Sequence, residues 1–236
     1  MPYLNKVRVR QYVEDWGRDV CVRRTLEGLR SRVVRRRGPI RCLSRRSCNR
    51  LIRYARNGKW RVMITLTYRV DPGPEKAKSD LHRFCQELRR RGLSGLWFME
   101  FQLRGVVHYH ILCTGYVPKE WVSSTWGRIV GDKEVERVGT RVEWLRTQGA
   151  GYVAKYAVKS EQKEAPGEGW GRFWGVFGRA VEWITVPVGA FVVRLLRRWA
   201  RSRRVIIRDN GVRGYWINDG GKVWQNILVA YGCQVL

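Results

Sequence analysis

WFMEFQLRGVVHYHILC, residues 97–113, contains two strand-like runs separated by a tight corner at Arg104 and Gly105. Apolar and polar side chains alternate along the first run as far as Gln102. A period of two that is interrupted by a glycine predicts a β-hairpin. His108 and His110 are two residues apart on the second strand, so both imidazoles are expected to point to the same face of the hairpin.

The position of Glu100 relative to these histidines depends on the length of the hairpin loop. A two-residue loop pairs Phe101 with His108 and turns Glu100 to the opposite face. A three-residue loop over 103–105, with Gly105 left-handed in a bulge, pairs Glu100 with His108 instead. We adopt the longer loop because it also gathers the apolar side chains on the other face. These side chains are Trp97, Met99, Phe101, Val107, Tyr109 and Ile111.

In this register Glu100, His108 and His110 can hold a single divalent metal ion. A His-x-His pair on a strand also occurs in purely structural, hydrogen-bonded roles. Here, however, the chain has only three histidines, and two of them lie beside an inward-facing carboxylate. Two imidazoles and one carboxylate leave open positions on a metal, as a catalytic metal site requires.

The charge of the chain predicts a polyanionic partner. The 236 residues carry a net charge of +27, and residues 1–60 alone hold 18 Lys/Arg against 4 Asp/Glu. Arginine suits bidentate contacts with phosphate, and basic residues interleaved with aromatic ones suit single-stranded nucleic acid. Many of the aromatic residues are also expected to fill the core. The arginines expected to bind DNA are Arg35, Arg36, Arg37, Arg45, Arg46 and Arg50.

Composition also indicates where the protein works. The six cysteines show neither CxxC pairs nor zinc-finger spacing, so we expect reduced thiols. The opening residues lack the apolar core of a signal peptide, and the longest apolar run, 184–196, is interrupted and too short to span a bilayer. We therefore expect a soluble, cytoplasmic protein.

The order of elements predicts an α+β fold with an antiparallel central sheet and flanking helices. After a basic arm over residues 1–43 and a Ser44-capped helix, the pattern reads βαββαβα, which is a ferredoxin-like, split βαβ plan. The expected core elements are a strand at 60–68, a helix at 75–91, the hairpin, a helix at 119–130, a strand at 141–145 and a helix from Gly151. The expected divisions are a basic arm and helix (1–58), a core (59–163) and a C-terminal α/β extension (164–236).

The last core helix contains YVAKYAVK, residues 152–159, in which two tyrosines and two lysines each recur after four residues. Each pair therefore shares a helix face. A phenol with a pKa near 10 is a poor nucleophile, but it can attack a phosphodiester if a metal polarises the phosphate and an ammonium stabilises the charge. The alternative is an amphipathic helix with half-buried tyrosines and solvated lysines.

ITLTY (64–68), EFQLRGVVHYH (100–110) and YVAKYAVK, in this order, resemble the three motifs of His-hydrophobe-His endonucleases. More narrowly, the chain is similar to the rolling-circle replication initiators of small phages and plasmids. The resemblance covers about residues 60–160, with looser similarity in the basic helix before them and in GRFWGVFGR after them.

The resemblance implies that tyrosine cuts one DNA strand at an origin, stays linked to the 5′ phosphate and frees a 3′ hydroxyl. His108, His110 and Glu100 would then bind Mg²⁺ or Mn²⁺. The implied nucleophiles and their assisting cations are Tyr156, Tyr152, Lys159 and Lys155. Implied partners are single-stranded origin DNA, a host helicase and a DNA polymerase, because no P-loop motif is present.

Two other functions fit parts of the sequence. A non-enzymatic single-strand-binding protein on the same sheet explains the charge and the aromatic residues, but not the Glu-His-His set beside paired Tyr-Lys. Single-tyrosine transposases share the motif order but are usually shorter and less basic. A requirement for divalent metal in nicking separates the enzyme from the binding protein.

Overall fold

A computed structural model describes residues 8–16, 18–27, 38, 40–146, 151, 153, 165–203, 207–209, 214–217 and 220–230. The chain forms two compact units. One unit consists of Arg37–Val181, and the other combines Met1–Arg36 with Glu182–Leu236. We call them the core unit and the second unit, and each is described by itself.

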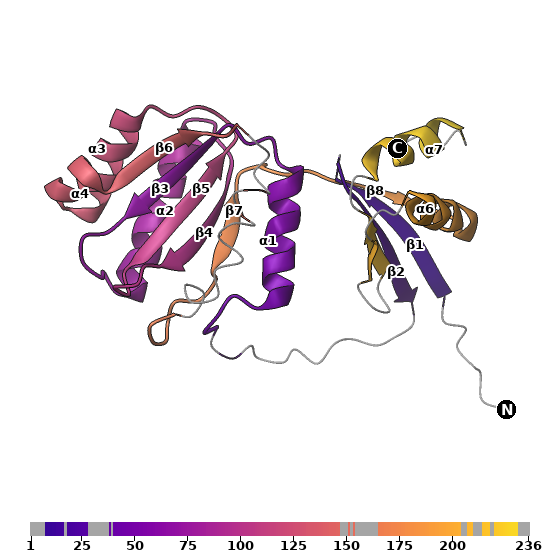
Figure 1. Ribbon diagram of the computed structural model, residues 1–236, viewed down its shortest axis with the longest axis horizontal. Helices are drawn as coiled ribbons and strands as arrows, with labels where there is room; N and C mark the ends of the chain where they lie inside the picture. Colours follow the sequence, from indigo (N-terminus) through magenta and orange to yellow (C-terminus); the bar gives the residue numbers. More distant parts are fainter. Residues whose placement is uncertain are drawn as a thin grey trace. The chain divides into compact units, whose positions relative to one another are not determined.

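The core unit is built on a five-stranded antiparallel sheet with the order β6-β3-β5-β4-β7 (Figure 1). Its strands are β3 (Val62–Thr67), β4 (Gly95–Phe101), β5 (Val107–Cys113), β6 (Thr140–Trp144) and β7 (Trp174–Phe177). Both β3 and β4 pair antiparallel with β5, so they run parallel to each other with β5 between them. This is the predicted split βαβ arrangement, and the expected α+β fold class is confirmed.

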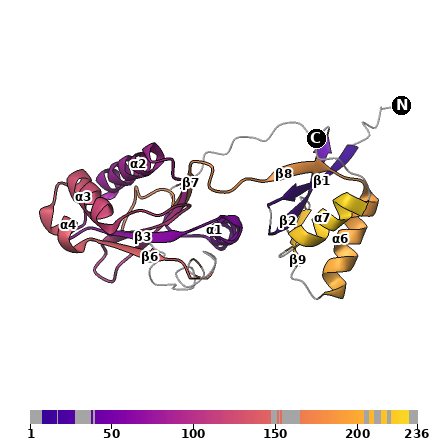
Figure 2. The same cartoon turned by 90° about the horizontal axis from the view of Figure 1, so that it is seen from above.

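Helices cover both faces of this sheet. They are α1 (Arg45–Asn57), α2 (Pro74–Arg90), α3 (Lys119–Val130) and α4 (Lys133–Val138). Residues of α2 and α3 pack with Ile64 and Tyr109 in the largest apolar cluster, on one face of the sheet (Figure 2). On the other face, Leu51 and Ala55 of α1 pack with Met63. Because α1 reaches only part of this face, polar side chains occupy the rest.

Local signals in the sequence place the core helices. The Ser44 hydroxyl accepts a hydrogen bond from the Ser47 amide at 3.2 Å, so it caps α1 as predicted. Pro74 opens α2, and His82 on this helix is exposed. The short helix α4 was not predicted. It begins where Asp132 accepts a hydrogen bond from the Glu134 amide at 3.0 Å.

The second unit contains another five-stranded antiparallel sheet, with the order β8-β1-β2-β10-β9. Its elements are β1 (Arg8–Asp15), β2 (Val20–Glu27), β8 (Ile184–Pro187), α6 (Ala190–Ser202), β9 (Ile207–Asp209), β10 (Gly214–Ile217) and α7 (Gly221–Ala230). Leu196 of α6 and Trp224 of α7 pack against Val20 and Val22 of the sheet. In this unit β9 and β10 pair antiparallel.

Two parts of the chain lie elsewhere than the sequence predicted. The N-terminal residues expected to form a loosely packed arm contain β1 and β2, which lie inside the second sheet. β7, expected in the C-terminal extension, pairs with β4 and extends the core sheet. The boundaries at 58 and 163 therefore differ from the observed units. β1 and β2 pair with each other across a short connection, but their other partners, β8 and β10, are distant in sequence, as β4 is from β7. Local periodicity carries no information about these distant pairings.

No helix in the described part of the chain is long and apolar enough to cross a membrane. Among the described residues, Cys21, Cys42, Cys48, Cys85 and Cys113 form no disulfide bond. Burial raises the pKa of Cys85 to about 12, so this thiol stays protonated at neutral pH and is a poor nucleophile.

Candidate metal centre

The hairpin of β4 and β5 has the three-residue loop that the sequence predicted. Glu100 lies opposite His108 in the strand register. Gly105 has a φ of 79°, in the left-handed region that favours glycine. The Gln102 amide donates to the Val106 carbonyl at 2.9 Å, and the Gly105 amide donates to the Gln102 carbonyl at 2.8 Å. The longer loop is confirmed, and with it the shared face of the three polar side chains.

Glu100, His108 and His110 each offer a ligand atom, and these atoms all lie within 4.8 Å of one another. The apolar residues of the hairpin occupy the opposite face. Met99, Phe101, Val107, Tyr109 and Ile111 are each exposed by 5% or less, and Trp97 is partly buried against the same cluster. The burial of that face prevents a slip in register, because a slip of one residue would turn the whole apolar set to the other side.

His110 is held by contacts on both ring nitrogens. Its Nε2 donates to Glu100 Oε1 at 3.1 Å, and its Nδ1 lies 3.1 Å from the Thr65 hydroxyl. The ring also stacks on Phe98, with centroids 5.1 Å apart. At 3% exposure it cannot swing into solvent. A metal entering here would take the Nε2 lone pair, so the proton shared with Glu100 would leave on binding.

His108 is poised as a neutral ligand. Its Nε2 lies 2.5 Å from the Thr67 hydroxyl and 2.8 Å from the Gln102 amide nitrogen. An amide nitrogen only donates, so the His108 Nε2 is unprotonated and accepts. Burial, followed by the neighbouring His110, lowers the pKa of His108 to about 4. The imidazole is therefore uncharged at neutral pH, which is the form that binds metal.

This low pKa predicts a pH-dependent stability. In the folded chain His108 has a pKa of about 4, against 6.5 for an ordinary histidine. As the pH falls from about 7 to 4, the unfolded chain binds a proton that the folded chain does not, so His108 lowers stability in this window. In EDTA, the urea midpoint of the native chain should therefore fall more between about pH 7 and pH 5 than that of His108→Gln.

A suitable control is His82→Gln, because His82 is exposed on α2. This variant should keep the full pH dependence of the native chain. Equal falls in the midpoint for the native chain and for His108→Gln would show that His108 titrates normally.

The environment of the Glu100 carboxylate indicates that Glu100, His108 and His110 can bind a cation. The Oε1 of this carboxylate accepts from His110, but its Oε2 is buried and has no hydrogen-bond partner among the described residues. A buried carboxylate oxygen without a partner is costly, and coordination to a cation would satisfy it. One carboxylate oxygen and two imidazole nitrogens make a donor set for a divalent metal ion.

The three residues line a hollow of about 670 Å³ whose other walls the sequence did not identify. Thr65 and Thr67, which contact the histidines, also line it, and Lys119 and Arg141 bring positive charge to it. Arg141 also pairs with Glu143 at 2.8 Å. Lys119 begins α3 and Arg141 lies on β6, so only the folded sheet brings them beside His108 and His110. The hollow can therefore accept an anionic group beside a cation.

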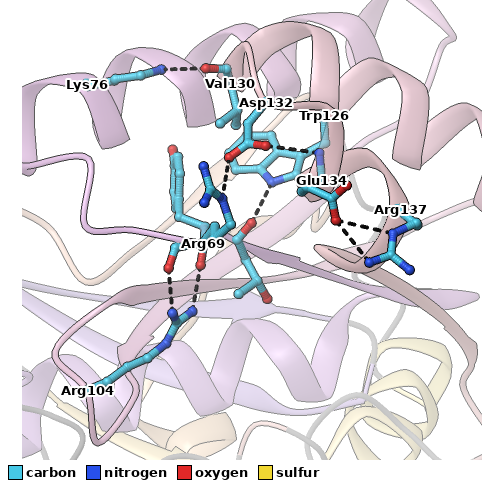
Figure 3. A network of polar contacts seen from close by, with 10 residues as sticks. Arg69, Lys76, Arg104, Trp126, Val130, Asp132, Glu134 and Arg137 are labelled. Carbon is cyan, nitrogen blue, oxygen red and sulfur yellow. Dashed lines mark hydrogen bonds and ion pairs between the residues drawn. The ribbon is translucent and has the colours of Figure 1, made fainter.

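Hydrogen bonds from Arg104 connect the loop of the hairpin to the residues that follow β3. Arg104 donates to the Tyr68 carbonyl at 2.6 Å and to the Arg69 carbonyl at 2.5 Å (Figure 3). Its Nε also donates to Gln102 Oε1 at 2.6 Å. Arg104 therefore orients the amide group that contacts His108, although it does not touch the candidate ligands. In the sequence, Arg104 is recognisable only as part of a turn.

The predicted tyrosine helix falls almost wholly outside the described residues. The residues of this helix that lie outside the described part of the chain include the predicted nucleophiles and cations, Tyr152, Lys155, Tyr156 and Lys159. Gly151 and Val153 are helical, as predicted for its start. Val153 is fully buried in the same apolar cluster as Phe98, whose ring stacks on His110. The start of the helix therefore packs on the face of the sheet that carries the candidate ligands.

Of the arginines predicted to bind DNA, three are described. Arg45, Arg46 and Arg50 are exposed on α1, and the Arg50 guanidinium lies 5.7 Å from the ring centroid of Trp174. The segment 35–37 is outside the described ranges. The three arginines on α1 remain open to solvent, as contacts with a polyanion require.

Comparison with known proteins agrees with the position of this site. Residues 61–161, which contain the whole hairpin and the hollow, match the family model of the replication-associated protein ORF2/G2P. No curated protein and no solved structure matches the chain. The match supports a role in replication and covers less than half of the chain.

Proposed function

We propose that this chain is a replication initiator that nicks one DNA strand at an origin through a tyrosine and later rejoins it. The observation that carries the proposal is the Glu100, His108 and His110 cluster, with ligand atoms within 4.8 Å of one another. It lies inside the segment that matches a replication-associated family. A single-strand-binding protein needs no such set of metal ligands.

The residues of the hollow have separate roles in this proposal. Glu100, His108 and His110 hold one Mg²⁺ or Mn²⁺ ion, which withdraws charge from the oxygens of the scissile phosphate when bound. Lys119, which lines the same hollow, holds a further phosphate oxygen. Thr65 and Thr67 orient the two imidazoles through their hydroxyl groups.

In the proposed reaction, Tyr156 or Tyr152 attacks the phosphorus. The tyrosine oxygen forms a bond to phosphorus, the bond from phosphorus to the 3′ oxygen breaks, and the phenol proton leaves to solvent or a nearby base. Lys159 and Lys155 stabilise the developing charge. The 3′ oxygen becomes a hydroxyl that a polymerase can extend. The phosphotyrosine link is a phosphodiester in its turn, so attack by a 3′ hydroxyl reverses the step and rejoins the strand.

The test is covalent capture of DNA. The full chain is incubated with single-stranded fragments that cover the DNA encoding it and its flanks, in Mn²⁺, in Mg²⁺ or in EDTA. We expect a protein–DNA adduct that survives denaturing electrophoresis and forms only with metal. Metal-dependent cutting without an adduct would point to a hydrolytic nuclease, and binding without cutting would point to a single-strand-binding protein.

A further inference from the structure

Helix α6 of the second unit has one face buried in its own sheet and one face lined by arginine. Val193, Leu196 and Ala200 are exposed by 4% or less and belong to the apolar cluster of the second unit. Four arginines are exposed on the other side of the helix: Arg194, Arg197, Arg198 and Arg201. We call these four residues the α6 arginine face. The roles proposed above for the core unit do not use it.

The spacing of the arginine face concentrates charge. With 3.6 residues per turn, the four side chains lie within about 100° of the helix circumference and span about 10 Å along its axis. They are neighbours three and four residues apart, a spacing at which like charges repel and destabilise a helix. Helix α6 contains no acidic residue to offset this repulsion. The exposed side of the helix therefore concentrates four positive charges that the phosphates of a polyanion can neutralise.

The side chains of α6 distinguish between possible polyanions, namely a membrane surface, single-stranded DNA and duplex DNA. The apolar side of α6 is buried in the protein's own core, so this helix cannot insert into a membrane as an amphipathic anchor does. Single-stranded DNA is usually held by a row of aromatic rings on which bases stack. On α6, Trp199 packs against the cluster of the second unit, which leaves Phe191 in the first turn as the one ring beside the arginines.

We propose that the α6 arginine face binds the phosphates of duplex DNA. Guanidinium groups bind phosphate oxygens in pairs, and a row about 10 Å long reaches several phosphates of a duplex. The second unit as a whole holds 19 Lys/Arg against 7 Asp/Glu, a net charge of +12. The contact needs neither metal nor tyrosine. It therefore stands independently of the proposed nicking activity.

The test removes the four charges and measures binding to a labelled 25-base-pair duplex. The full-length variant R194Q/R197Q/R198Q/R201Q and the native chain are titrated in EDTA over a range of sodium chloride concentrations, with fluorescence anisotropy as the readout. We expect the affinity for the duplex to fall at least about tenfold. The slope of log K against log salt should become shallower by about three to four, because fewer counterions are released.

The matched control removes four arginines from the core helices α2 and α3. Arg83, Arg89, Arg90 and Arg128 are exposed there, on helices that cover the face of the sheet opposite the candidate metal centre. The variant R83Q/R89Q/R90Q/R128Q has the same net charge as the α6 variant. Its salt slope should change by less than about one. If both variants lost the same affinity for the duplex, the effect would depend on net charge alone, and the proposal would be overturned.

Two further measurements separate the remaining outcomes. An unchanged circular dichroism spectrum shows that the α6 variant is folded. In the double variants R194Q/R198Q and R197Q/R201Q, the salt slope should each time change by about half as much as in the fourfold variant. A loss of binding to a 25-nucleotide single strand but not to the duplex would contradict the proposal. Adduct formation on single-stranded fragments should be unaffected, so failure of the nicking proposal would show separately.

Discussion

Replacing His108 and His110 together with alanine is expected to abolish nicking while leaving DNA binding largely intact. The exchange removes two of the three candidate ligands but none of the exposed basic residues. Loss of residues that merely orient ligands typically costs 10- to 100-fold in metal affinity or activity, so loss of two ligands should cost more than about 100-fold. The measurements are adduct formation in Mn²⁺ and anisotropy of a labelled single strand in EDTA.

Because His110 is 3% exposed, its alanine variant leaves a cavity and removes the hydrogen bond to Glu100. The variant His108→Asn, at the more exposed ligand, separates chemistry from folding. It should keep the native circular dichroism and lose calorimetric Mn²⁺ binding. The matched control is His82→Ala on α2, which should be fully active. Unchanged nicking by the double variant, or full activity of the native chain in EDTA, would exclude this site.

The second large effect concerns the two tyrosines. Tyr156→Phe is expected to lose most of the first cleavage, whereas Tyr152→Phe should cleave once and then fail at strand transfer and termination. We assign Tyr156 as the principal nucleophile because Lys159 follows it by three residues, which is about one helical turn. Phenylalanine keeps the ring and removes only the hydroxyl group, so a loss of activity reports chemistry and not packing.

Mass spectrometry of the covalent peptide–oligonucleotide adduct decides this assignment. The native chain should carry the oligonucleotide on Tyr156 after the first cut, and on both tyrosines after several rounds. The control is Tyr116→Phe, an exposed tyrosine that stacks on Trp144 in the core unit and should not affect the adduct. An adduct on Tyr152 alone would reverse the assignment. An adduct on neither tyrosine would reject the mechanism.

The structure also identifies residues near the candidate site that the sequence did not. Thr65, Thr67 and Gln102 contact the two imidazoles, and Lys119 lines the same hollow. Thr65 and Thr67 are ordinary residues for a strand, and Lys119 opens a helix, so nothing in their local pattern marks them. Their role depends on pairing between β3 and β5, which are about 40 residues apart in the chain.

The sequence by itself determined the hairpin, its register and the shared face of Glu100, His108 and His110. It did so because period-two alternation and a left-handed glycine act over neighbouring residues. Only the tertiary structure decided that β1 and β2 pair with β8 and β10, and that β7 extends the core sheet. Such pairings join segments far apart in the chain, and the apolar faces that drive them find partners only when the whole unit has folded.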